Sequence, residues 1–141
     1  MRVLSLIILN SMLWSSAWAQ TDTREILALT ASHRTIILNE MHQFLTGVHA
    51  ITKALAENDM ETIQQRAKPL GMAMAENIPP ELMKTLPDEF KKLGFAVHNQ
   101  FDRIALDAQA LENKAHTLTQ MASLLNKCVA CHDVYQIKIQ E

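Results

Sequence analysis

Residues that interrupt helices are scarce in this chain, and their scarcity limits the folds open to it. The 141 residues include only three glycines and four prolines, and all four prolines fall between positions 69 and 87. The long stretches on either side are rich in alanine, leucine, glutamate, glutamine, lysine and methionine, which favour helices. No stretch shows the sustained polar and apolar alternation of a strand. The sequence therefore predicts an all-α fold.

The first nineteen residues have the pattern of an export signal. Arg2 gives a positive start, residues 3–13 are mostly apolar, and Ala17-Trp18-Ala19 places small residues where a signal peptidase cleaves. The apolar run is shorter than the ~20 residues that a membrane-spanning helix needs. We therefore expect residues 1–19 to be removed before Gln20. Residues 20–141 should form one exported domain without membrane attachment.

The charge of the chain is nearly balanced, with 13 basic and 15 acidic side chains and a net charge of −2. A balance this mild gives no reason to expect a nucleic-acid partner. The sequence also shows no acid–base pair, no nucleophile with its base and no phosphate-binding loop. We therefore expect no enzymatic turnover of an organic substrate.

Hydrophobic periodicity predicts four helices, over about residues 21–57, 60–77, 88–111 and 113–139. Asn58-Asp59 should end the first helix, Pro69 should kink the second, and a short turn is expected over residues 81–84. The expected inward positions of the first helix are Leu27, Leu38, Met41, Leu45, Val48 and Leu55. Those of the last helix are Leu118, Met121, Leu125, Cys128, His132 and Tyr135. Four such helices predict an antiparallel four-helix bundle.

Cys128, Cys131 and His132 form the motif with the most specific chemistry. The spacing C-x-x-C-H places two thiols one helical turn apart, with an imidazole on the same face. It is typical of c-type haem attachment, in which the thiols add to the two vinyl groups of one porphyrin and the imidazole coordinates iron. We therefore expect one covalent haem c inside the bundle, bonded to Cys128 and Cys131, with His132 as an axial iron ligand.

Three other interpretations of the two cysteines remain open. A redox-active dithiol needs a thioredoxin-like βαβ context, which the sequence does not show. A structural zinc site needs a fourth ligand at suitable spacing, and there is no second cysteine pair. A disulfide between Cys128 and Cys131 gives His132 no role. Haem attachment is the interpretation that uses all three residues.

In its layout the whole chain after the signal resembles the cytochrome c prime family. These are periplasmic four-helix-bundle haem proteins with a C-x-x-C-H motif near the C-terminus. Residues 128–135, Cys-Val-Ala-Cys-His-Asp-Val-Tyr, are similar to the family's C-x-x-C-H-x-x-Tyr. The family usually has a basic residue directly after the tyrosine, where this chain has Gln136. The resemblance implies a periplasmic location and a homodimer formed through the first two helices.

The same resemblance also indicates which residues of the first helix lie on the side of the iron opposite His132. The family has an arginine that contacts the haem and, four residues later, the residue over the iron, which here fit Arg34 and Leu38. Leucine cannot coordinate iron, so the resemblance implies a five-coordinate haem that can bind NO or CO. Met41 lies on the same helical face and is the alternative. It would serve either as a sixth ligand in a low-spin electron carrier or as a flexible core side chain.

The remaining histidines have weaker claims to ligation. His33 and His42 are expected at the border of the inward face, and His98 and Asp102, four residues apart, can hydrogen-bond to each other. Taken together, the sequence predicts a periplasmic monohaem cytochrome that acts in one-electron transfer, with redox proteins as partners and NO or CO as possible ligands.

Overall fold

The computed structural model describes residues 21–140, so the predicted signal peptide lies outside the described residues. The described chain is mostly helical, in agreement with its composition. Its elements, in chain order, are β1 (Glu25–Leu29), α1 (Ala31–Glu57), α2 (Met60–Ala67), the 3₁₀ turn η1 (Lys68–Leu70), α3 (Met72–Ala75), α4 (Pro80–Thr85), α5 (Asp88–Leu111), α6 (Lys114–Val134) and β2 (Tyr135–Ile139). No helix between residues 21 and 140 is long and apolar enough to cross a membrane.

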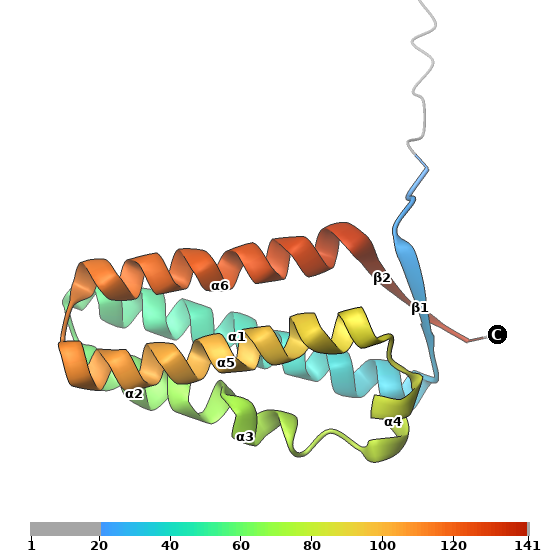
Figure 1. The fold of residues 1–141 in the computed structure, drawn as a ribbon, viewed down its shortest axis with the longest axis horizontal. Coiled ribbons are helices and arrows are strands. Elements are labelled where there is room, and N and C mark those ends of the chain that lie inside the picture. Colours follow the sequence, from blue (N-terminus) through green and yellow to red (C-terminus); the bar gives the residue numbers. More distant parts are fainter. Residues whose placement is uncertain (1–20, 141) are drawn as a thin grey trace, which may run out of the picture.

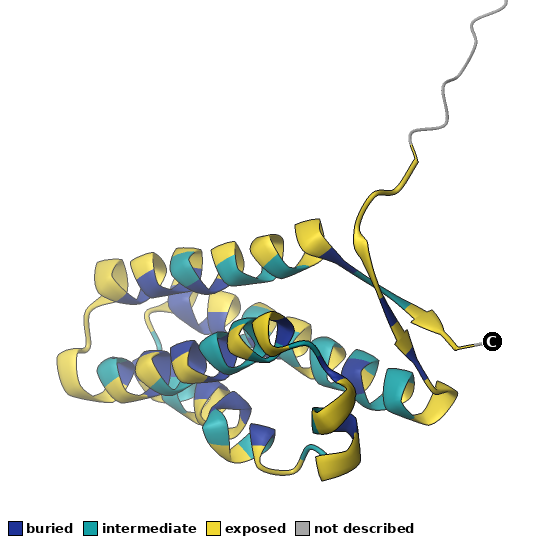
Figure 2. Ribbon diagram, turned by 45° about the vertical axis from the view of Figure 1, so that its right-hand side comes forward, coloured by how far each residue is buried: buried dark blue, intermediate teal, exposed yellow. Residues whose placement is uncertain are grey.

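Helices α1, α2, α5 and α6 lie side by side, and consecutive ones run in opposite directions (Figure 1). Both α1 and α5 contact α2 and α6. The buried residues lie between the helices, and the outward faces are exposed (Figure 2). One core cluster includes Phe101 and Leu124, and a second, which includes Leu82 and Tyr135, also takes in the strands.

Side-chain hydrogen bonds cap the starts of α1, α2 and α6. The Thr30 hydroxyl accepts a hydrogen bond from the His33 N–H at 3.2 Å and begins α1. Asn58 ends α1 in the left-handed conformation, with φ of 59°. The Asp59 carboxylate then caps α2 through the Thr62 N–H at 2.9 Å. The predicted break at Asn58-Asp59 is therefore confirmed.

The region around the prolines is also close to the prediction. The helix that was expected over residues 60–77 is interrupted at Pro69, where α2 gives way to η1, because proline cannot donate the backbone hydrogen bond that a helix requires. The turn expected over residues 81–84 is the short helix α4. The helix expected to begin with Pro87-Asp88-Glu89 and to run through Leu111 is confirmed as α5, in which Pro87 precedes the first helical residue.

The predicted start of the first helix and the predicted end of the last helix are both wrong. The first helix begins at Ala31 rather than near residue 21, and the last helix ends at Val134 rather than near residue 139. The segments beyond them are β1 and β2, which pair in parallel with Glu25 opposite Tyr135 and Leu29 opposite Ile139. These partners lie far apart in the sequence, so the periodicity of either segment alone does not reveal the pairing.

The buried faces of α1 and α6 also differ from the predicted ones. Leu45 on α1 is 67 % exposed, and Leu118 and Leu125 on α6 are 60 % and 46 % exposed. Instead α6 buries Thr117 and Gln120 beside Met121 and Leu124. The prediction considered apolar residues only. Thr117 and Gln120 can be buried because they donate hydrogen bonds to the Asn113 carbonyl and the Asp107 carboxylate.

Candidate functional site

The C-x-x-C-H motif lies in the last two turns of α6 and borders a cavity. Cys128 and Cys131 are half-buried free thiols, and His132 is exposed. All three residues line a cavity of about 500 Å³ that is also bordered by α1 and α5. This volume lies within the ~300–1,000 Å³ that is usual for pockets that hold a small molecule or cofactor.

The walls of this cavity are mainly apolar. Its polar or charged lining residues, besides the motif, are Glu40, His42 and Lys127. Its apolar lining residues are Ile37, Met41, Phe44, Leu45, Val48, Phe90, Leu93, Val97 and Leu125. Side chains from three helices therefore surround a space suited to a large apolar group.

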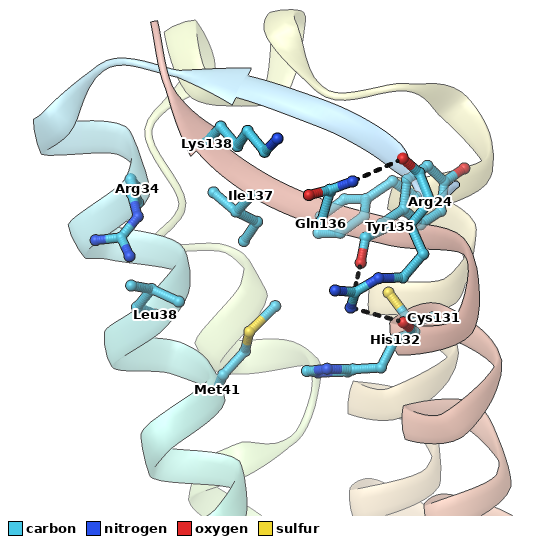
Figure 3. Close-up of a pocket in the computed structure, with 11 residues that line it drawn as sticks. Arg24, Arg34, Leu38, Met41, Cys131, His132, Tyr135, Gln136, Ile137 and Lys138 are labelled. Carbon is cyan, nitrogen blue, oxygen red and sulfur yellow. Dashed lines mark hydrogen bonds between the residues drawn. The ribbon is translucent and has the colours of Figure 1, made fainter. Parts of the chain in front are cut away.

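A second cavity of about 300 Å³ shares Met41, Phe90, Cys131 and His132 with the first. Figure 3 shows Arg34, Leu38 and Met41 on α1, across this cavity from Cys131 and His132 on α6. The residues that sequence reasoning selected therefore lie around two adjoining cavities. Cys128 lines only the larger cavity, Arg34 and Leu38 line only the smaller one, and Met41 lines both.

Arg24 is a residue of this region that sequence reasoning missed. Its guanidinium donates hydrogen bonds to the carbonyl oxygens of His132 at 3.2 Å and Tyr135 at 3.5 Å, beside the end of α6 (Figure 3). It also pairs with the Asp22 carboxylate at 2.7 Å and lowers the pKa of Asp22 to about 2 through this hydrogen bond. No local pattern in the sequence indicates Arg24, because it reaches the end of α6 only through the pairing of β1 with β2.

Phe90 and Tyr135 are the aromatic residues in the wall of the smaller cavity. Tyr135 is buried, and its ring packs edge-on against Phe90, with the centroids 5.4 Å apart and an interplanar angle of 87°. The Gln136 side chain donates to the Arg24 carbonyl at 3.0 Å. Gln136 occupies the position after the tyrosine, which is usually basic in the resembled family. Its hydrogen bond connects β2 to Arg24, the residue that precedes β1.

The environment of the thiols bears on the redox interpretation. Burial raises the pKa of both Cys128 and Cys131, because desolvation disfavours the thiolate. Dithiols that act in disulfide exchange instead have a lowered thiol pKa. The surroundings of these two cysteines therefore differ from those of a redox-active C-x-x-C pair.

The expected hydrogen bond between His98 and Asp102 is wrong. His98 is buried, with Nδ1 at 2.8 Å from the Leu70 carbonyl and Nε2 at 3.4 Å from the Glu40 carboxylate. Asp102 accepts a hydrogen bond from the Met72 N–H at 2.9 Å instead. His33 is half-buried, and His42 is exposed at the rim of the larger cavity.

The residues present around the two cavities fit a haem group. Two unpaired thiols one helical turn apart and the adjacent imidazole have the chemistry of covalent attachment and iron coordination. The apolar walls suit a porphyrin, and Arg34 and Lys138 at the smaller cavity supply cations for its carboxylates. In comparisons with family models, curated proteins and solved structures, this chain matches none of them.

Proposed function

We propose that this chain is an exported monohaem c-type cytochrome that acts in one-electron transfer in the periplasm, with redox proteins as partners. Its architecture would be an antiparallel four-helix bundle of the cytochrome c prime type, with the haem attached to α6. One observation carries the proposal. Cys128, Cys131 and His132 together border a mainly apolar cavity large enough for a cofactor.

Each residue around the cavities has a distinct role in this proposal. Cys128 and Cys131 hold the haem through thioether bonds, and His132 supplies the axial nitrogen ligand. Arg34 pairs with a haem carboxylate and offsets the unfavourable burial of that charge. The apolar walls exclude water. When bound, haem supplies one-electron redox chemistry and an iron centre that can bind small gases.

The residue on the α1 side of the iron decides which form of the function applies. With Leu38 in that place, the bulk of a side chain that cannot coordinate leaves a five-coordinate site that admits NO or CO. The alternative is a low-spin, six-coordinate electron carrier with Met41 as the sixth ligand. This alternative is favoured by the position of Met41, because it lines both cavities and its side chain projects from α1 into the space opposite His132 (Figure 3).

One set of absorption spectra tests the proposal and separates the two forms. The full chain is produced together with a c-type haem attachment system, and the reduced protein is examined with and without CO. A high-spin spectrum that changes with CO supports the five-coordinate site. A low-spin spectrum that becomes high-spin in Met41→Ala supports Met41 as a ligand. The proposal fails if the purified protein has no Soret absorption.

The covalent attachment has its own test. The double variant Cys128→Ala, Cys131→Ala should lose all haem that survives denaturation, because no thiol remains to form a thioether. The matched control is Met41→Ala, which also removes a cavity-lining sulfur and should keep covalent haem. Covalent haem in the double variant, measured by mass spectrometry, would contradict the assigned attachment residues.

A further inference from the structure

One residue of α5 that lines the larger cavity has no side chain. Phe90, Leu93, Gly94 and Val97 line this cavity from α5. Phe90 and Val97 are buried, and Leu93, three residues after Phe90, is half-buried. Gly94, four residues after Phe90, presents no side chain to the cavity.

The packing of the chain does not explain this glycine. A Cβ added at Gly47 would collide with the Leu70 side chain, and one added at Gly71 would collide with Asp102. A Cβ added at Gly94 meets no heavy atom within 4 Å. No described glycine has a positive φ, so the backbone of α5 does not require glycine either.

Gly94 is also unfavourable for the helix in which it lies. A glycine inside a helix lowers stability relative to alanine, because it loses more backbone freedom on folding. Protein interiors normally contain few voids larger than a water molecule. At Gly94, however, the wall of α5 opens onto the cavity of about 500 Å³ that Cys128 and Cys131 line from α6.

We infer that Gly94 is a cofactor-binding position, where the absent side chain leaves room for the porphyrin against the backbone of α5. This inference rests on the proposed haem function and adds a residue that the C-x-x-C-H motif does not indicate. The chain keeps an unfavourable glycine at this half-buried position of the cavity wall because an apolar occupant fills the space. Gly94 thereby determines how large a group the cavity accepts.

The test replaces Gly94 with a side chain that fills the space. In Gly94→Leu, the new side chain occupies the cavity and favours the helix, so the haem-free chain should melt at a temperature equal to or above that of the wild type. The same variant, produced with the attachment system, should contain at least about tenfold less haem per protein than the wild type, because the cofactor must displace the leucine.

A smaller substitution covers the case in which Gly94→Leu does not fold. Gly94→Ala adds one methyl group and should raise the melting temperature of the haem-free chain. It should also reduce the difference in melting temperature between the haem-loaded and haem-free forms. The matched control is Ala110→Leu on an exposed turn of α5, which should load haem as the wild type does.

The outcomes separate this inference from the proposed function. The inference holds if the wild type and Ala110→Leu take up haem while Gly94→Leu folds but loads poorly, or while Gly94→Ala gains less melting temperature from haem than the wild type does. Equal haem content and an identical Soret maximum in the wild type and Gly94→Leu would overturn it while leaving the proposed function intact. A wild-type chain without haem would overturn both.

Discussion

At the scale of single residues, His98 shows how a polar side chain can be buried in this fold. Only 1 % of it is exposed, yet both ring nitrogens face an oxygen, one on the Leu70 carbonyl and one on the Glu40 carboxylate. The Phe44 ring packs against it edge-on at 5.0 Å. Because these partners belong to η1 and α1, the imidazole joins α5 to two other elements.

The same contacts give the stability of the protein a pH dependence. Burial lowers the pKa of His98, but the Glu40 carboxylate and the Leu70 carbonyl raise it by more, so it lies above the ordinary value of 6.5. A raised pKa in the folded state adds stability that is fully present below the unfolded value. This stability is lost as the pH rises through the folded value.

We therefore predict that part of the free energy of unfolding of the haem-free chain is lost as the pH rises above the ordinary value of 6.5, which a measurement on either side of it, at about pH 6 and about pH 8, should detect. Glu40→Gln should reduce this fall, because it removes the carboxylate that stabilises the imidazolium. Urea unfolding at both pH values measures the effect. Glu57→Gln, on an exposed turn of α1, is the matched control and should keep the wild-type slope. An unchanged slope in Glu40→Gln would show that the pair is not coupled to folding.

At the scale of elements, the strand β1 buries alternate residues. Leu27 and Leu29 are 4 % and 2 % exposed, whereas Ile26, which directly precedes Leu27, is 50 % exposed. This period of two belongs to a strand, because successive side chains point to opposite faces.

This alternation predicts the cost of truncating each side chain. Leu27→Ala should lower the free energy of unfolding by ~2–5 kcal/mol, because it removes buried apolar contacts. Ile26→Ala, at the neighbouring exposed position, should change it by no more than about 0.5 kcal/mol. Chemical denaturation of the haem-free chain measures both. Similar losses in the two variants would mean that residues 25–29 do not form the strand described above.

The elements also show what sequence periodicity can and cannot predict. The bounds of α5 follow from Pro87 and the acidic residues of its first turn, which are local features. The family resemblance indicated Arg34 and Leu38, and helical spacing added Met41; all three lie on α1 and line the smaller cavity. Arg24 and Gln136, by contrast, reach the cavity region through the pairing of β1 with β2, which no local pattern contains.

At the scale of the whole molecule, the buried apolar side chains form two separate core clusters. The cluster around Phe101 and Leu124 lies among α1, α2, η1, α5 and α6. The cluster that includes Leu82 and Tyr135 depends on the strands and on α4. The two cavities adjoin the second cluster, because Phe90 and Cys131 belong to both the cluster and the cavity walls.

Ending the chain at Val134 should therefore damage the second cluster selectively. We predict a loss of at least ~3 kcal/mol, since the truncation removes the buried Tyr135 ring and leaves Leu27 and Leu29 without partners. The control ends at Ile139 and loses mainly the hydrogen bonds of Gln140 to β1, worth about 1 kcal/mol each. Circular dichroism should show that the chain ending at Val134 keeps most of its helix. Wild-type stability in that chain would exclude a structural role for β2.

The pairing of Glu25 with Tyr135 also constrains the order in which the molecule can form. In the chain β1 precedes α1 and β2 follows α6, so β1 has no strand to pair with until residues 135–139 have been made. The Arg24 contacts to the His132 and Tyr135 carbonyls need the same late part of the chain. The end of the molecule that holds both cysteines can therefore close only after every helix from α1 to α6 has been made.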